Sequence, residues 1–134
     1  MNRHRQREST FRIVFSMDIN KSDNTEEDLR VYLESLELAE EEDRELIVRR
    51  CLRLIENQEA IDKMIVACTQ NWEVDRIGKI ELAILRVAVF EMLYDEMPVS
   101  VAINEAVELA KKYGEDHSSK FVNGVLGQVA KRLV

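Results

Sequence analysis

Apolar residues recur along this chain at the spacing of one face of an α-helix. The clearest stripe is Ile61, Met64, Ile65 and Cys68, which follows the i, i+3, i+4, i+7 pattern of a helix that buries one side. Only four glycines and one proline interrupt the chain, which favours long helices over many short strands. The pattern therefore predicts an all-α fold.

The stripes and their polar interruptions divide the chain into about seven helices. Phe11, Val14 and Phe15 place the first helix before residue 18. Trp72 follows the fourth stripe and is interpreted as a packing anchor rather than a stacking platform. Further helices are predicted over residues 26–36, from the acidic run at residues 40–43 to residue 56, along the stripe from residue 61 to residue 68 and over residues 77–94. The last two are predicted between the turn at residues 95–100 and Gly114, and from about residue 119 to residue 133. Their expected caps are Thr25, Asn57 and either Ser118 or Ser119 at N-termini, and Gly114 at a C-terminus.

Residues 77–94 are hydrophobic nearly all round, which is typical of a central, buried helix. Glu81, Arg86 and Glu91 point in three different directions on such a helix, so they cannot share one solvated face. We expect Arg86 and Glu91 to find internal partners, because an unpaired buried charge is costly. Glu81 lies near the helix start, where another protein can reach it.

Composition favours a single domain spanning residues 1–134, in a cytoplasmic protein. Hydrophobic residues make up 46% of the chain and charged residues 34%, as in soluble globular proteins. No run of 18 apolar residues and no apolar signal core is present, so no membrane association is expected. Cys51 and Cys68 have no metal-binding spacing and are interpreted as reduced core residues.

The first fifteen residues are basic, whereas the rest of the chain is acidic. Arg3, Arg5, Arg7 and Arg12, with Glu8 as the only acid, give this segment about +3, and a total of −7 leaves about −10 elsewhere. Cations at a helix start oppose the helix dipole, so local helix stability does not explain them. The segment is either a polyanion site or a solvated terminus.

The predicted last helix carries a second candidate contact. Lys120, Gly124, Gly127 and Lys131 share one side of it, and the two glycines suggest that a neighbouring helix or a ligand approaches the backbone closely. Lys120 and Phe121 lie in the first turn, where a cation beside a border aromatic suits a phosphate and a stacked base. The alternative is that Phe121 closes the rim of the core.

No catalytic or metal-binding pattern is found. The two histidines, His4 and His117, belong to no triad motif, and the chain has no phosphate-binding glycine loop and no metal-ligand spacing. We therefore expect no enzyme activity, no metal and no cofactor.

Two sequence words resemble the NusB family. They are AINEAVELAK at residues 102–111 and KFVNGVL at residues 120–126. Residues 81–93 resemble the long central helix of that family, and residues 3–15 resemble its arginine-rich first helix. The similarity covers essentially the whole chain.

The resemblance implies a fold of two packed helical bundles and a role in bacterial transcription antitermination. Family members bind single-stranded boxA RNA of nascent ribosomal RNA transcripts with NusE, a small-subunit ribosomal protein, in a complex with RNA polymerase. Matched by motif, the implied RNA contacts are Arg3, Arg5, Arg7, Lys120 and Phe121. The implied NusE-facing residues are Asp75 and Glu81.

Two other interpretations remain open. A NusB-like domain also occurs fused to RNA cytosine methyltransferases, so the chain can be a fragment of such an enzyme. It can also be a structural module that self-associates, because some family members form homodimers. One departure from the family lies at His117, where an acid or Asn is common.

Overall fold

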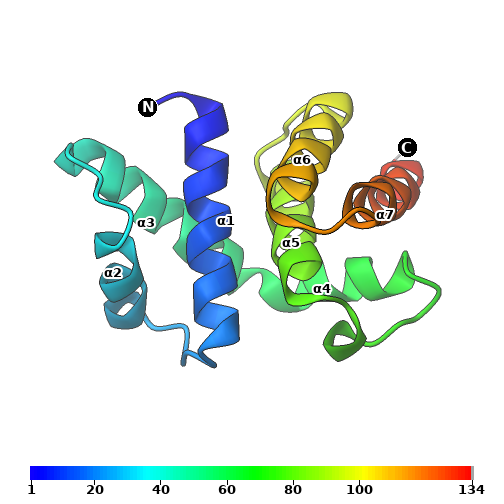
Figure 1. Cartoon of the computed structure of the whole chain (residues 1–134), viewed down its shortest axis with the longest axis horizontal. Coiled ribbons are helices and arrows are strands. Elements are labelled where there is room, and N and C mark those ends of the chain that lie inside the picture. Colours follow the sequence, from blue (N-terminus) through cyan, green and yellow to red (C-terminus); the bar gives the residue numbers. More distant parts are fainter. Residues whose placement is uncertain (134) are drawn as a thin grey trace. The chain divides into compact units, whose positions relative to one another are not determined.

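The computed structural model describes residues 1–133 and shows, within them, seven α-helices, one short 3₁₀-helix and no strand (Figure 1). The prediction of an all-α fold is therefore confirmed. The helices are α1 (Arg3–Ile19), α2 (Glu26–Glu34), α3 (Glu41–Glu56), α4 (Gln58–Ala67), η1 (Val74–Arg76), α5 (Lys79–Tyr94), α6 (Val99–Tyr113) and α7 (Ser118–Arg132).

The chain forms two compact units, Met1–Glu56 and Asn57–Val134. The first unit contains α1, α2 and α3, which all pack against one another. The second contains α4, η1, α5, α6 and α7. Each unit is a helical bundle, and the assignment of the whole chain to one domain stays a prediction.

The core of the first unit comes from the apolar stripes of its three helices. Its buried residues are Ile13, Met17, Leu29, Leu33, Ile47, Val48 and Cys51. Burial raises the pKa of the Cys51 thiol to about 12, so this group stays protonated at neutral pH. Both cysteines are buried and free, as the sequence predicts.

One predicted helix end and one predicted cap differ in detail from the structure. α2 ends at Glu34, two residues early, because the Ser35 hydroxyl donates to the Tyr32 carbonyl oxygen (2.7 Å) and closes the turn. Leu36 leaves the helix but still packs on the core of the first unit. Asn57 occupies the N-cap position of α4, but its side chain makes no capping hydrogen bond.

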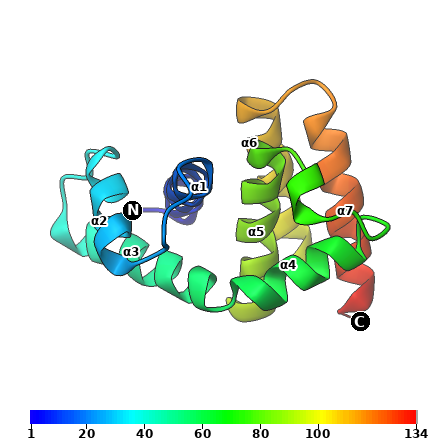
Figure 2. The same cartoon turned by 90° about the horizontal axis from the view of Figure 1, so that it is seen from below.

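α5 is the central helix of the second unit, as its sequence predicts. It contacts α4, α6 and α7, and the views agree on this arrangement (Figure 2). All eleven residues from Leu82 to Met92 are buried, including Arg86 and Glu91. A helix surrounded on all sides needs apolar residues on all sides, which explains its unusual composition.

The Arg86 charge is paired inside the second unit. Its guanidinium makes two hydrogen bonds to the Asp62 carboxylate on α4, from Nε at 2.8 Å and Nη2 at 2.9 Å. The Arg86 side chain is 6% exposed and that of Asp62 is 21% exposed. The expected internal pairing of Arg86 is confirmed, and its partner lies 24 positions away in the sequence. Glu91 is 1% exposed.

No helix in residues 1–133 is long and apolar enough to cross a membrane.

We predict that Asp62→Ala lowers the free energy of unfolding by about 3 kcal/mol, because it removes the bidentate carboxylate from a buried guanidinium. Urea unfolding followed by circular dichroism measures the change. The matched control is Glu59→Ala, one turn earlier on α4, whose pair with Lys63 is 86% and 78% exposed. An exposed pair contributes little, so this variant should stay within about 0.5 kcal/mol of the wild type. Equal losses in the two variants would contradict the prediction.

Candidate nucleic-acid interface

The basic N-terminal segment is the beginning of a regular helix. α1 starts at Arg3, and the Asn2 side-chain oxygen accepts a 2.9 Å hydrogen bond from the backbone N–H of Arg5. The amino group of Met1 lies 3.6 Å from the Asp43 carboxylate on α3. These contacts fix the start of α1 within the first unit, so its arginines are presented at helical spacing.

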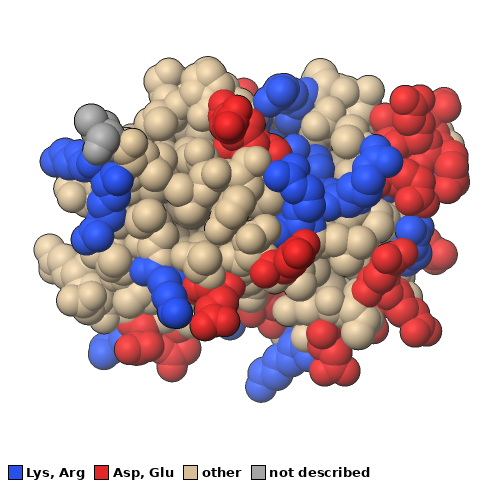
Figure 3. Space-filling model, turned by 180° about the vertical axis from the view of Figure 1, so that it is seen from behind, with Lys and Arg blue, Asp and Glu red and all other residues tan. Residues whose placement is uncertain are grey.

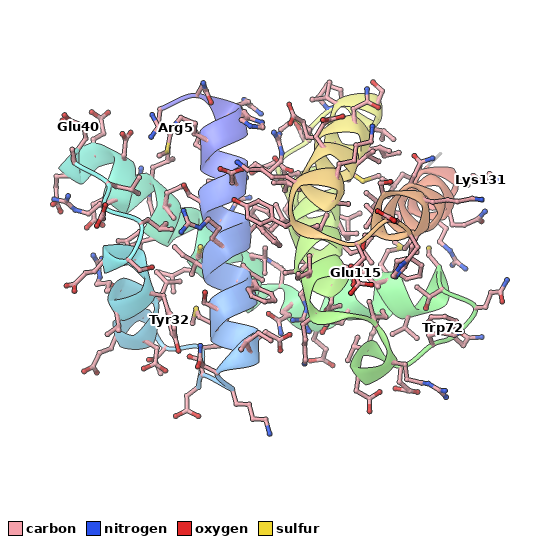
Figure 4. The ribbon with its side chains drawn as sticks, in the orientation of Figure 1. Arg5, Tyr32, Glu40, Trp72, Glu115 and Lys131 are labelled. Atoms are coloured by element: carbon pink, nitrogen blue, oxygen red, sulfur yellow. The ribbon has the colours of Figure 1, made fainter. Side chains whose placement is uncertain are left out.

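The predicted RNA-binding arginines differ in exposure. Arg3 and Arg5 are exposed, whereas Arg7 is only 2% exposed. Figure 4 shows Arg5 extending from the N-terminal part of α1. At 100° per residue, Arg12 lies about 20° from Arg5 around the helix, and it is also exposed. Arg12 was not among the predicted contacts, although its i, i+7 spacing from Arg5 indicates the shared face.

The second predicted contact lies at the start of α7. Lys120 is exposed and Phe121 is half-buried, both in the first turn. The Trp72 ring stacks on Phe121, with ring centroids 6.1 Å apart and an interplanar angle of 25°. Trp72 is 49% exposed, so it packs on the Phe121 ring at the surface and not within the core. Figure 4 shows it in the segment that follows α4.

A hollow of about 250 Å³ opens beside this aromatic pair, and we term it the aromatic pocket. Its lining combines two aromatic rings, a guanidinium, an imidazole and a carboxylate. The lining residues are Trp72, Arg76, Ile77, Gly78, Glu81, His117 and Phe121. All seven belong to the second unit. Arg76 lies in η1, a helix that the hydrophobic pattern did not predict.

A buried hydroxyl connects the Glu81 carboxylate to the start of α7. Ser118 is fully buried; its Oγ donates to Glu81 Oε2 at 2.6 Å and accepts from the Glu115 backbone N–H at 2.9 Å. Ser118 is therefore the first residue of α7 and not its cap, and His117 occupies the N-cap position. At least one oxygen of the Glu81 carboxylate is thus bound within the chain. The expectation that a partner protein contacts Glu81 stays a prediction.

Two glycines make room for this hydrogen bond. A Cβ at Gly78 would lie 2.0 Å from Glu81 Oε1. A Cβ at Gly114 would lie 2.5 Å from Ser118 Oγ and 2.8 Å from the Ala110 carbonyl oxygen. Any larger side chain at either position would displace the carboxylate or the hydroxyl.

Gly124 and Gly127 have a different setting from the one predicted. A Cβ at either position would meet no atom within 4 Å in the described part of the chain. No neighbouring helix approaches the backbone of α7 there, so of the two predicted reasons for these glycines the first is wrong. Lys120, Gly124 and Lys131 are exposed along this side of the helix.

The structure brings together Lys120, Phe121, Glu81 and Trp72 within the second unit, whereas the arginines of α1 belong to the first. Asp75 is exposed on η1, next to Arg76. On the face drawn in Figure 3, Lys and Arg side chains gather in one continuous group in the upper centre, with acidic side chains at its edges. In the described residues, no three His, Cys, Asp or Glu side chains are grouped to hold a metal ion.

Comparison with known proteins gives the same family along nearly the whole chain. The model of the NusB family matches residues 4–131. The transcription antitermination protein NusB of Acetivibrio thermocellus is 43% identical over 132 residues, which cover 98% of this chain and 90% of that protein. NusB of Lachnoclostridium phytofermentans is 42% identical, over 96% of this chain and 98% of its own.

Solved structures agree with the sequence comparison. NusB of T. maritima superposes with a TM-score of 0.85 at 31% identity, over 98% of this chain and 92% of that one. The crystal structure of antitermination factors NusB and NusE in complex with dsRNA gives a TM-score of 0.83 at 25% identity. That match covers 98% of this chain and 99% of the other.

We predict that Ser118→Ala lowers the free energy of unfolding by about 1.5–3 kcal/mol, because the half-buried Glu81 carboxylate loses the hydroxyl that donates to it. Ser119→Ala is the matched control: Ser119 is only half-buried, and its loss should change stability by less than about 0.5 kcal/mol. Thermal unfolding of these variants, of Glu81→Gln and of the double variant with Glu81→Gln and Ser118→Ala measures the coupling energy between Glu81 and Ser118. A Ser118→Ala protein as stable as the wild type would refute this role.

We also predict opposite signs for two glycine substitutions. Gly127→Ala should stabilise the protein by about 0.5–1 kcal/mol, because alanine favours the helix and the added methyl group meets open space. Gly114→Ala should destabilise it, because the methyl group would collide with the Ala110 carbonyl oxygen. The denaturant concentration at half-unfolding measures both changes, provided that the variants share the same m-value. A loss of stability in Gly127→Ala would contradict the finding that the added methyl group meets open space.

Proposed function

This chain belongs to the NusB family, and we propose that it is a transcription antitermination factor that binds boxA RNA of nascent ribosomal RNA transcripts together with NusE. The observation that carries the proposal is the match of residues 4–131 to the family, with a full-length relative at 43% identity that is named a transcription antitermination protein. The similarity to a NusB–NusE–RNA complex supports RNA and NusE as ligands.

The RNA contacts that we propose divide into charge and stacking. Arg3, Arg5 and Lys120 are exposed cations and would neutralise phosphates. Phe121 would stack on an unpaired base, because proteins that read RNA sequence mostly bind unpaired bases. Arg7 belongs to the proposed motif, but at 2% exposure its guanidinium has little access to solvent. We therefore assign the phosphate contacts of α1 first to Arg3 and Arg5.

The proposed NusE contact rests on acidic charge. The chain beyond its first fifteen residues carries about −10, which complements a basic ribosomal protein. Asp75 is exposed and open to such a partner, whereas Glu81 is hydrogen-bonded to Ser118. Of the two predicted residues, Asp75 is thus the better candidate for a direct contact.

We further propose that the protein acts without catalysis, as an adaptor in the cytoplasm. Its relatives are named for antitermination, a process on nascent transcripts, and its sequence carries no catalytic motif. RNA, NusE and the transcribing RNA polymerase would then be its partners. Its effect on transcription would then depend on how tightly it binds these partners and where it holds them, and it would make or break no covalent bond.

Arg5→Ala should weaken the binding of boxA RNA and of an unrelated RNA of equal length by the same factor, because a phosphate contact carries no sequence information. It should also lower the slope of log affinity against log salt by about 0.7, the value for one lost contact to a single strand. Fluorescence anisotropy with saturating NusE at several salt concentrations measures both.

Arg30→Ala provides the control for this experiment. Arg30 is exposed but already paired with Glu26 and Glu45, at 2.9 Å from each, so its charge is largely neutralised within the first unit. Its removal should leave the RNA affinity and the salt slope unchanged. If Arg5→Ala also leaves both unchanged, α1 does not supply the phosphate contact that we propose.

A further inference from the structure

Trp72 is the chain's only tryptophan, and it is held half-exposed at the mouth of the aromatic pocket. Its place after the fourth apolar stripe predicts only a packing role. A large aromatic ring left in solvent beside polar side chains is more typical of binding surfaces than of folding cores. Stability alone therefore does not explain its position.

The backbone around Trp72 holds the ring in place. Gln70 and Asn71 adopt positive φ angles of 59° and 66°, which turn the chain outward after α4. Such a conformation is unfavourable for a residue with a long side chain and needs support from its surroundings. The buried Thr69 hydroxyl supplies it, because it donates to the Val66 carbonyl oxygen at 3.0 Å and accepts from the Trp72 N–H at 3.2 Å.

The size and chemistry of the aromatic pocket suit a single base. Its volume of about 250 Å³ lies below the roughly 300–1,000 Å³ of ordinary small-molecule sites. The Trp72 ring stacks on Phe121 and is 49% exposed, so its uncovered face can take a base of any identity. Arg76 and His117 line the same hollow, and the exposed Lys120 precedes Phe121 in the chain. An exposed guanidinium at this rim suits the adjoining phosphate.

The charges favour RNA over the protein partner as occupant. Arg76 lines the pocket and Lys120 is exposed next to Phe121, so a nucleotide can satisfy both the rings and the cations. The acidic residue of the pocket, Glu81, is already bound through one oxygen to Ser118.

We propose that the aromatic pocket receives one unpaired base of the bound RNA, with Trp72 as the stacking residue and Arg76 as the contact for the adjacent phosphate. The inference rests on the proposed function, and it adds two RNA-binding residues that the family motif does not assign. Trp72 enlarges the stacking surface that Phe121 alone would offer, and it is preorganised by Thr69.

The intrinsic fluorescence of the full chain tests this directly, because all tryptophan emission comes from Trp72. A boxA RNA oligonucleotide is titrated with saturating NusE, whose own emission is subtracted, while anisotropy of a labelled copy reports binding. We expect saturable quenching of Trp72 that follows the anisotropy curve. Oligonucleotides with one abasic site each should identify a single position whose loss abolishes the quenching.

Variants supply an independent measurement. Trp72→Ala should weaken RNA binding by roughly 5- to 150-fold, which corresponds to the ~1–3 kcal/mol of one base stacked on an aromatic ring. Trp72→Phe should recover most of that affinity. The matched control is Val101→Ala, another exposed apolar residue of the second unit that does not line the pocket, and it should bind like the wild type.

The outcomes separate the inference from the proposed function. RNA that binds by anisotropy without changing Trp72 emission, and with Trp72→Ala within twofold of wild type, overturns the inference and leaves the function intact. A change of emission on adding NusE, with none on adding RNA, also overturns it, because the pocket then takes a protein side chain. Absence of RNA binding with and without NusE refutes the proposed function itself.

Discussion

The hydrogen bond between Glu81 and Ser118 is the constraint on which the candidate site in the second unit depends. It joins the first turn of α5 to the first residue of α7. Both partners lie close to a glycine backbone. Any residue larger than glycine at position 78 would displace the carboxylate, and at position 114 it would displace the hydroxyl. Phe121 follows three residues later, so the direction of α7 sets where its ring meets Trp72. A partly buried hydrogen bond therefore positions the site.

The core of the second unit is built around α5, the helix that carries Glu81. α5 is enclosed by α4, α6 and α7, and its charged residues must be satisfied inside the bundle. Arg86 meets this requirement through Asp62, which ties α4 to α5. A carboxylate with good bidentate geometry makes such a charge tolerable, whereas removing it would leave the guanidinium with less compensation for its lost hydration. Apolar packing and one ion pair thus fix the elements that carry the pocket.

The RNA contacts that we propose in the first and in the second unit rely on different physics. Arg3 and Arg5 supply charge from the first turns of α1, and charge acts on any phosphate and weakens with salt. Phe121 and Trp72 supply aromatic surface, which acts at short range and needs an unpaired base. The net charge of the chain is negative, so it repels RNA that does not make these contacts. The combination of local cations and aromatic rings would therefore favour specific over non-specific RNA binding.

The sequence alone determined the helices, because periodic burial is a local property: the stripe from Ile61 to Cys68 and the cap at Thr25 need only their near neighbours. The quoted motifs also indicated the family. Only the tertiary structure decided that Trp72 is exposed, that Arg7 is buried, and that Ser118 binds Glu81. Each depends on where a distant segment lies, and a linear pattern does not contain the contacts between residues 37 positions apart.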